Sequence, residues 1–522
     1  MLKGDHSFQR RQETILASPI KSSQRPRWWR RNWFYATLIT LAIVGVFCAF
    51  FLPPLIPGIN SEGETADSLR KAILAVLAGS LTMLTLSETH RKNNQEKEKN
   101  ERDHIRQVYA ERRSRYIKAV EQLANDKAAV RLGGIYTLVG LVDEWLADDT
   151  LDPEERQKEG QVIINNLCSY IRSPFPLAEE IEEYEAHKEL EKLQKSESEK
   201  LRETESSQLQ ILLKRFEDSG EYENPKDITT DYAKFREEQD VRRAIFVEMG
   251  KRSSVISNKE EGDVTVIPGT WSDFDFDFSR APIFYPLNNL TIEKANFSLG
   301  RFYGEISFLK TTFVRKADFC EAVFIQHADF AGTTFIQHAD FTGTTFTQHA
   351  DFTETIFTQE VRFGKATFIQ TADFRVAVFT QNARFRMSTF AQEVRFGEAT
   401  FTQNADFSLT TFTQGVSFRK TTFTQKAVFR SATFAQNTNF NDSYFKKYAP
   451  TFAEGSDAAR FSNRVIWADS NFSVRSGSQP IKPGDATLDG KTFRIPIGAV
   501  IFNPDSWDEE IKKYTHISDP AK

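Results

Sequence analysis

Three histidines recur at one position of a repeat in the second half of the chain, and they are the residues best suited to metal chemistry. His327, His338 and His349 occupy the same place in three successive repeat units. Imidazole nitrogens bind several transition metals, but a protein site gathers three or four ligands in one place. No carboxylate or cysteine completes such a set here. We therefore expect no metal and no other cofactor, and we interpret the histidines as duplicated solvent-facing side chains.

The arrangements of residues that usually perform catalysis are missing from the sequence. It contains no Ser/His/Asp or Cys/His arrangement, no P-loop and no HExxH zinc motif. Its three cysteines, Cys48, Cys168 and Cys320, lie far apart, without the paired spacing of zinc sites, redox motifs or disulfide frameworks. We therefore predict that the protein is not an enzyme and has no catalytic residues.

Phenylalanine gives the strongest structural signal, because it occurs 46 times and lies mostly after residue 296. From Phe297 to Phe445 it recurs with gaps that alternate between five and six, so one five and one six together make an eleven-residue repeat. A small or β-branched residue lies two positions before nearly every Phe, as Ala339 does before Phe341. Side chains two apart on a strand point to the same face, so both should point inward. The predicted core ladder consists of Phe297, Phe302, Phe308, Phe313, Phe319, Phe324, Phe330, Phe335, Phe341, Phe346, Phe352, Phe357, Phe363, Phe368, Phe374, Phe379, Phe385, Phe390, Phe396, Phe401, Phe407, Phe412, Phe418, Phe423, Phe429, Phe434, Phe440 and Phe445.

Stacked strands explain this repeat better than a helix does. A right-handed coiled coil can have a repeat of the same length, but it needs apolar gaps of three and four. The repeat instead resembles the pentapeptide-repeat family, with Ala328-Asp329-Phe330 in place of its A(D/N)LXX unit and one extra residue in alternate units. The resemblance implies a right-handed quadrilateral β-helix in which four units, or two full repeats, make one coil. Seven coils at a strand spacing of about 4.8 Å would form a rod roughly 34 Å long.

Two sets of polar residues should lie on the outside of this β-helix. We expect the glutamines to form amide ladders at corners. In gyrase-protecting members of the family that the repeat resembles, an acidic rod imitates DNA. Between residues 297 and 445 there are 13 acidic and 14 basic side chains, which argues against such mimicry, although an Asp-rich stretch from 318 to 354 keeps that hypothesis open. The glutamines are Gln326, Gln337, Gln348, Gln359, Gln370, Gln381, Gln392, Gln403, Gln414, Gln425 and Gln436.

Two apolar segments near the N-terminus predict a membrane anchor. The first, Trp33 to Leu55, is about as long as a helix that crosses a bilayer core of roughly 30 Å. A cleaved signal peptide is the alternative, but no small-residue cleavage site follows. The second, Ala72 to Leu86, is shorter, so an interfacial or buried helix stays open for it. Arginines before the first segment and Arg91 to Lys99 after the second predict two spans with both ends in the cytoplasm.

The region between the anchor and the repeat is predicted to be helical. Residues 92 to 125 are highly charged and lack Pro and Gly, which predicts a solvated stalk. Apolar residues at helical spacing then predict two helices that form a small module. In the first of these helices, Gly133 and Gly134 mark either a close helix contact or two tolerated glycines. Residues 115 to 173 also resemble the helical region of some bacterial membrane-anchored pentapeptide-repeat proteins.

These features divide the chain into six predicted regions. They are a basic cytoplasmic tail (1–32), two transmembrane helices with a short outer loop (33–88), a helical stalk and module with a charged, coiled-coil-like insert (89–252), an irregular linker (253–290), the pentapeptide-repeat β-helix (291–446) and a C-terminal capping region (447–522).

The functional expectation is a non-enzymatic interaction scaffold at the bacterial inner membrane. Its expected partners are the lipid bilayer, through two spans, and a protein whose identity the sequence does not give. Nucleic acid is not expected, and self-association stays open. Two alternatives remain: a DNA mimic that regulates a gyrase-type topoisomerase, and a membrane sensor that couples the spans to the solenoid.

Overall fold

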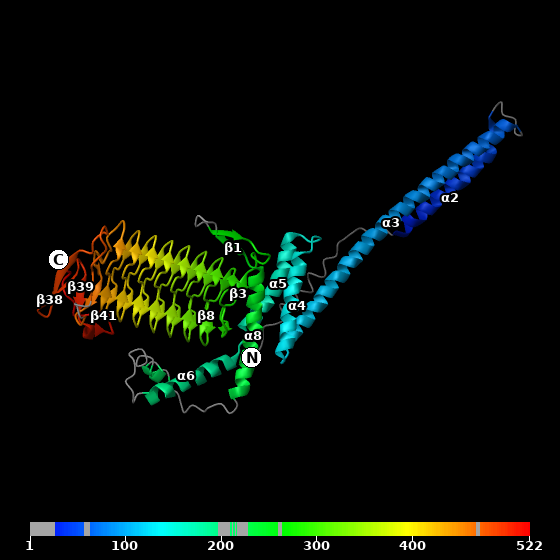
Figure 1. Cartoon of the computed structure of the whole chain (residues 1–522). Coiled ribbons are helices and arrows are strands. Elements are labelled where there is room, and N and C mark those ends of the chain that lie inside the picture. Colours follow the sequence, from blue (N-terminus) through cyan, green and yellow to red (C-terminus); the bar gives the residue numbers. More distant parts are fainter. Residues whose placement is uncertain are drawn as a thin grey trace. The chain divides into compact units, whose positions relative to one another are not determined.

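The computed structural model describes residues 27–56, 63–196, 209–210, 212–214, 216, 228–258, 264–465 and 470–522. The predicted tail through residue 26, most of the outer loop (57–62) and much of the charged insert lie outside these ranges. The chain divides into two compact units, Met1–Glu111 and Arg112–Lys522 (Figure 1). Each unit is described by itself.

The first unit contains a helical hairpin. Helix α2 spans Arg27–Phe51, the short 3₁₀ helix η1 spans Pro53–Leu55, and α3 begins at Glu64. The first span was predicted to run to Leu55, but α2 ends at Phe51 because prolines follow, and proline cannot continue a helix. Helix α3 runs over 60 residues to Leu123, so the predicted second span and the predicted stalk are one continuous helix.

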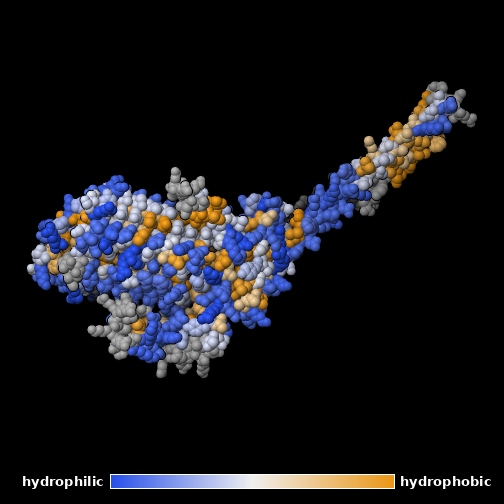
Figure 2. Space-filling model, in the orientation of Figure 1, coloured by the Kyte–Doolittle hydropathy of each residue, from blue (hydrophilic) through white to orange (hydrophobic). Residues whose placement is uncertain are grey.

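Small residues let the two helices of the hairpin approach each other closely. Gly45 and Ala49 of α2 are buried, and a β-carbon on Gly45 would lie 2.0 Å from Leu77 Cδ1 on α3. Figure 2 shows hydrophobic residues gathered on α2 and on the part of α3 beside it, followed by a hydrophilic stretch of α3. Among the described helices, α3 is the one long and apolar enough to cross a membrane, since the apolar part of α2, Ala36–Phe51, is shorter.

A helical module opens the second unit and packs on the first coil of the solenoid. It consists of α4 (Ala128–Leu146), α5 (Pro153–Arg172), α6 (Pro176–Ser196) and α8 (Ile228–Arg252). Phe246 of α8 lies 4.6 Å from Phe278 and 6.3 Å from Phe297, measured between ring centroids. The module therefore covers the N-terminal end of the Phe core.

The solenoid is four-sided, and its short strands form four parallel sheets of 8, 10, 7 and 8 strands. Each coil passes through the first, second, third and fourth sheet in turn, and paired residues of neighbouring coils lie two full repeats apart, as in Ala317 and Ala339. The first sheet contains β3 (Phe276–Asp277), β6 (Ala295–Asn296), β10 (Ala317–Asp318), β14 (Ala339–Asp340), β18 (Val361–Arg362), β22 (Ala383–Arg384), β26 (Ala405–Asp406) and β30 (Ala427–Val428). The second contains β4 (Pro282–Ile283), β7 (Arg301–Phe302), β11 (Val323–Phe324), β15 (Thr345–Phe346), β19 (Thr367–Phe368), β23 (Thr389–Phe390), β27 (Thr411–Phe412), β31 (Thr433–Phe434), β36 (Arg460–Ser462) and β39 (Val500–Phe502).

The other two sheets complete each coil. The third contains β8 (Ile306–Ser307), β12 (Ala328–Asp329), β16 (Ala350–Asp351), β20 (Ala372–Asp373), β24 (Val394–Arg395), β28 (Val416–Ser417) and β32 (Thr438–Asn439). The fourth contains β5 (Thr291–Ile292), β9 (Thr312–Phe313), β13 (Thr334–Phe335), β17 (Ile356–Phe357), β21 (Val378–Phe379), β25 (Thr400–Phe401), β29 (Thr422–Phe423) and β33 (Tyr444–Phe445). Because the chain visits the sheets in this order, the first faces away from the third and the second from the fourth.

Residues 253–258 and 264–290, predicted as part of an irregular linker, contain regular strands. They hold an antiparallel hairpin, β1 (Val255–Asn258) with β2 (Val264–Ile267), followed by β3 and β4, which pair with β6 and β7. The solenoid therefore begins before residue 291. The five-and-six Phe spacing does not extend this far back, but Phe276 and Ile283 still fill inward positions and are buried.

The two gap lengths produce two kinds of corner. In each five-residue gap the chain makes a tight turn, as in the hydrogen bond from Thr344 N to Phe341 O at 3.2 Å. The second residue after that Phe has positive φ, and it is usually not glycine: Glu354, Lys365 and Val376 lie at 58°, 59° and 60°. A positive φ costs residues other than glycine about 1–2 kcal/mol. The packing of the coil must therefore compensate for this cost at these corners.

Residues after Phe445 cover the C-terminal end of the solenoid. Strands β36 and β39 extend the second sheet, while Thr451, Asn471 and Val474 pair with the last strands or turns of other sheets. Three antiparallel hairpins lie around them: β34 (Ala453–Glu454) with β35 (Asp457–Ala458), β37 (Pro483–Leu488) with β38 (Lys491–Pro496), and β40 (Trp507–Asp508) with β41 (Lys513–Tyr514). The 3₁₀ helix η3 spans Pro504–Ser506. Residues 466–469 of the predicted capping region lie outside the described residues.

Candidate functional site: the outer faces of the solenoid

The Phe ladder forms the interior that holds the outer faces flat. Each of the 28 predicted Phe side chains is at most 1% exposed. Rings of successive coils stack in columns, with Phe319 and Phe341 4.9 Å apart, while Phe341 meets Phe330 of a different column edge to face at 5.6 Å. Offset stacks and edge-to-face pairs are the geometries that aromatic rings prefer. The buried hydroxyl of Thr344 donates to Phe319 O at 2.8 Å, so it is satisfied inside this core.

The outward residues divide the solenoid into two kinds of face. The second and fourth sheets present Thr, Ile and Val, and we call these surfaces the first and second threonine faces. The first and third sheets present Asp and Arg, and we call these the first and second charged faces. The first threonine face includes Thr345, Thr367, Thr389, Thr411 and Thr433, and the second includes Thr334, Ile356, Val378, Thr400 and Thr422. The first charged face includes Asp318, Asp340, Arg362, Arg384 and Asp406, and the second includes Asp329, Asp351, Asp373 and Arg395.

Ion pairs neutralise much of the charged faces. Arg384 pairs with Glu360 at 2.9 Å, and Arg375 pairs with Asp373 at 2.8 Å. Arg395 pairs with Glu393 at 2.6 Å. Pairs of this kind near the surface add little stability, but they interrupt any continuous run of negative charge.

The predicted histidines occupy equivalent corners, and two of them stack. The rings of His327 and His349 lie 5.2 Å apart, and His338 lies on another side of the coil. The Nδ1 of each histidine forms a hydrogen bond with a backbone carbonyl oxygen of the next coil. For His327 the acceptor is the carbonyl oxygen of His349, at 3.1 Å. Burial lowers the pKa of His349, and the neighbouring imidazole of His327 lowers it further. Within the described residues, no group of three or more His, Cys, Asp or Glu side chains is placed to hold a metal ion.

The predicted glutamine ladders do not form. No hydrogen bond joins two of these glutamines in the described part of the chain. The nearest equivalent is an asparagine pair, in which Asn404 Nδ2 donates to Asn382 Oδ1 at 3.3 Å. Gln326 instead donates to Glu182 of α6, and the Nε2 of Gln370 is buried without a partner.

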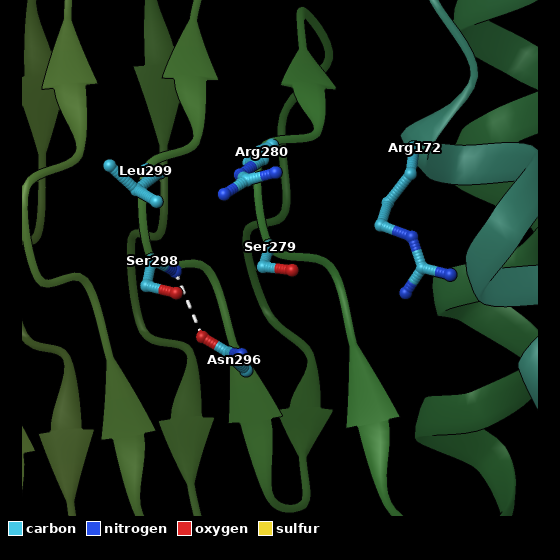
Figure 3. A pocket seen from close by; sticks show the side chains of 6 residues that line it. All are labelled: Arg172, Ser279, Arg280, Asn296, Ser298 and Leu299. Carbon is cyan, nitrogen blue, oxygen red and sulfur yellow. Dashed lines mark hydrogen bonds between the residues drawn. The ribbon is translucent and has the colours of Figure 1, made fainter.

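A small hollow lies where α5 meets the first coils. It is lined by Arg172, Ser279, Arg280, Asn296, Ser298 and Leu299 (Figure 3). Arg172 is already paired with the carboxylate of Asp277 at 2.6 Å and also donates to its carbonyl at 2.7 Å. One of its two arginines is therefore neutralised, and the lining brings together no nucleophile with a base.

A buried charge cluster holds the helical module together beside the solenoid. The guanidinium of Arg242 is 1% exposed and donates to Glu238 at 2.7 Å and to the carbonyl of Ile171 at 2.8 Å. Tyr170 donates to the same Glu238 carboxylate at 3.0 Å. Burial raises the pKa of Tyr170, and the neighbouring carboxylate raises it further. The i, i+4 spacing of Glu238 and Arg242 on α8 was an available signal for their ion pair. Nothing in the sequence pointed to their contacts with Tyr170 and Ile171 of α5, because these residues are about 70 positions away.

Comparison with known proteins identifies the repeat. The family model described as "Pentapeptide repeats (9 copies)" matches residues 330–378 and 377–422. Together with the four-sided coil, this match makes the chain a pentapeptide-repeat protein whose repeats form a β-solenoid. No curated protein matched the chain, and no solved structure matched it.

Proposed function

We propose that the protein is a non-enzymatic scaffold that binds a protein partner on the solenoid and is held at the bacterial inner membrane by two spans. The observation that carries this proposal is the pair of flat threonine faces on opposite sides of one rod, whose central strands carry no charged residue. The centres of protein interfaces are depleted in charged residues and match their partners in shape. A repetitive core that fixes these faces gives a partner a preformed surface.

The helical hairpin supports the anchor. Outward side chains of α2 and α3, such as Phe47 at 60% exposure and Met83 at 78%, are apolar, which is costly in water and favourable in lipid. Helix α2 has 25 residues, but its apolar part, Ala36–Phe51, covers only about 24 Å at 1.5 Å per residue, somewhat less than a bilayer core of about 30 Å. Two spans in this hairpin would leave both ends of the chain in the cytoplasm.

The DNA-mimic alternative has weaker support. Imitating a duplex requires a continuous negative surface. The acidic residues Asp329, Asp351 and Asp373 follow one another on one face, but Arg395 ends the series and Arg375 neutralises Asp373. DNA mimicry on the charged faces therefore has less support than the binding of a protein on the threonine faces.

Proximity labelling in living cells tests the proposal. The labelling enzyme is fused through a flexible linker to the C-terminus, and the control carries residues 1–111 alone with the same enzyme. Neighbours reproducibly enriched over this control are the expected result. A labelled set identical to that of the control would overturn the scaffold, enrichment of gyrase would favour DNA mimicry, and absence of cytoplasmic labelling would refute the topology.

A further inference from the structure

The chain itself shows what one threonine face can bind. Helix α6 lies against the N-terminal end of the first threonine face, where Gln326 Nε2 donates to Glu182 Oε1 at 3.1 Å. One turn earlier on α6, Glu179 pairs with Arg301 at 3.6 Å. Glu182 is only 3% exposed, so this carboxylate is enclosed by the contact.

Apolar side chains beside these two contacts are covered as well. Tyr303 directly follows β7, and Ile325 directly follows β11. Their side chains are 6% and 9% exposed. Ile369 occupies the position of Ile325 two coils further along and is only half-buried. The face therefore continues beyond α6 with the same kind of surface and less cover.

The group that binds Glu182 recurs in every later coil. An amide occupies the place of Gln326 once per coil, and between these amides the face carries Thr, Ile and Ala. In one of these amides, the Nε2 of Gln370 is buried and makes no hydrogen bond in the described part of the chain, so the side chain has to turn outward to reach an acceptor on a partner. A buried donor without a partner costs about 1–3 kcal/mol. The recurring amides are Gln348, Gln370, Gln392, Gln414 and Gln436.

A helix can follow this row of amides. Residues three and four apart on a helix advance about 4.5 and 6.0 Å along its axis, while coils of the solenoid are about 4.8 Å apart. Glu179 and Glu182 already show this step, since they are three apart and contact the second and third coils in turn. Glutamates at a mixture of three- and four-residue spacings would reach successive amides.

We propose that the first threonine face beyond α6 binds a glutamate-rich amphipathic helix of a partner protein. Its carboxylates accept hydrogen bonds from Gln348, Gln370 and Gln392, and its small apolar residues lie on Thr367 and Ile369. The contact with α6 continues into this surface, and the carboxylate–amide pairing supplies the complementarity. The inference rests on the proposed scaffold function and specifies the chemistry of its partner.

A labelled peptide with the sequence of Pro176–Ser196 serves as the probe, and its binding to the full chain in detergent is followed by fluorescence anisotropy. The test variant combines Gln348→Glu, Gln370→Glu and Gln392→Glu, which place charge opposite the peptide carboxylates. The matched control combines Gln359→Glu, Gln381→Glu and Gln403→Glu, at the same repeat position beside the second threonine face. Circular dichroism shows that both variants are folded.

We expect the test variant to weaken binding at least tenfold and the control to change it less than twofold. Equal weakening in both variants would overturn the proposal, because it would reveal a general effect of charge. Binding that survives the test variant but is lost in Gln326→Glu would also overturn it, since the peptide would only replace α6. If proximity labelling finds neighbours that the test variant retains, the docking site is wrong and the scaffold stands. If labelling finds none in any variant, the scaffold itself is wrong.

Discussion

Phe319 and Phe341 lie a whole coil apart in the sequence, yet their rings stack 4.9 Å apart with planes inclined by only 1°. Phe341 also stacks on Phe363 at 4.8 Å, so each ring inside the column is held from both sides. Removing one ring therefore removes two stacking contacts and opens a cavity in a closed core.

Phe341→Ala should lower the free energy of unfolding by about 3–5 kcal/mol, the usual cost of emptying a buried aromatic site. Hydrogen exchange should show the loss concentrated in the coils next to residue 341, because each coil contacts only its neighbours. Thr345→Ala, at an outward position, is the control and should cost less than about 1 kcal/mol. Similar losses in the two variants would show that the ladder does not carry the stability.

Val376→Gly should stabilise the solenoid by about 1 kcal/mol, measured by urea unfolding, because relieving a left-handed backbone conformation is worth about that much. Val376 has φ of +60°, which is unfavourable for a β-branched residue and normal for glycine. Glycine already occupies the equivalent position at Gly332, with φ of +61°. Val378→Gly, two residues on in strand β21, is the control and should destabilise. Loss of stability in Val376→Gly would mean that side-chain contacts at the corner outweigh the backbone strain.

Gly134→Ala should destabilise the helical module by about 1–3 kcal/mol, because a β-carbon there would lie 2.8 Å from the carbonyl oxygen of Ala119 on α3. The neighbouring Gly133 has nothing within 4 Å of the same position. Gly133→Ala should therefore be neutral or stabilise α4 by up to about 1 kcal/mol. The measurement is the thermal unfolding midpoint of each variant. Equal changes in the two variants would show that the close contact between Gly134 and Ala119 does not contribute to stability.

Asp340 should make the stability of the solenoid depend on acidity. Burial alone would raise the pKa of this carboxyl group, but the nearby imidazole of His338 and the hydrogen bonds donated by Thr342 outweigh it and hold the pKa well below its ordinary value of 3.8. The carboxylate thus contributes stability that is present above pH 3.8 and is lost as the pH falls through the lower, folded-state value.

In Asp340→Asn this contribution is missing at every pH. The variant should be less stable than the natural sequence at pH 6, and the two unfolding midpoints should converge as the pH falls toward 2. A constant difference between them from pH 6 to pH 2 would show that the titration of Asp340 is not linked to folding.

The periodicity of Phe was sufficient to predict stacked strands with inward Phe side chains, and the resemblance to the pentapeptide-repeat family implied that four units make one coil. It failed at the first coil, where Phe276 and Ile283 fill the interior without the regular spacing. The alternating Asp and Phe from 273 to 278 were the available signal for a strand there. The positive φ at the corners was not predicted either, because residues such as Lys365 have no sequence signal for that conformation.

The contacts of the candidate surface could not be predicted in the same way. Gln326 and Glu182 are 144 positions apart, and nothing local in either segment indicates that they meet. The charged composition of α6 predicted part of a coiled-coil-like insert, because a sequence pattern shows which side of a helix is polar but not what that side contacts. The division into threonine and charged faces followed from the repeat only once the order of the sheets was known.

Because every coil pairs with the next in the same way, the length of the solenoid can change in equal steps of one coil. A duplication or deletion of one whole coil would lengthen or shorten it by about 4.8 Å and leave both end caps and every face in register. A change of a single repeat, which is half a coil, would instead turn all later coils by half a circuit, so that the first threonine face would continue into the second. Gene duplications or deletions that add or remove whole coils could therefore change the length of the solenoid without changing the order of its faces.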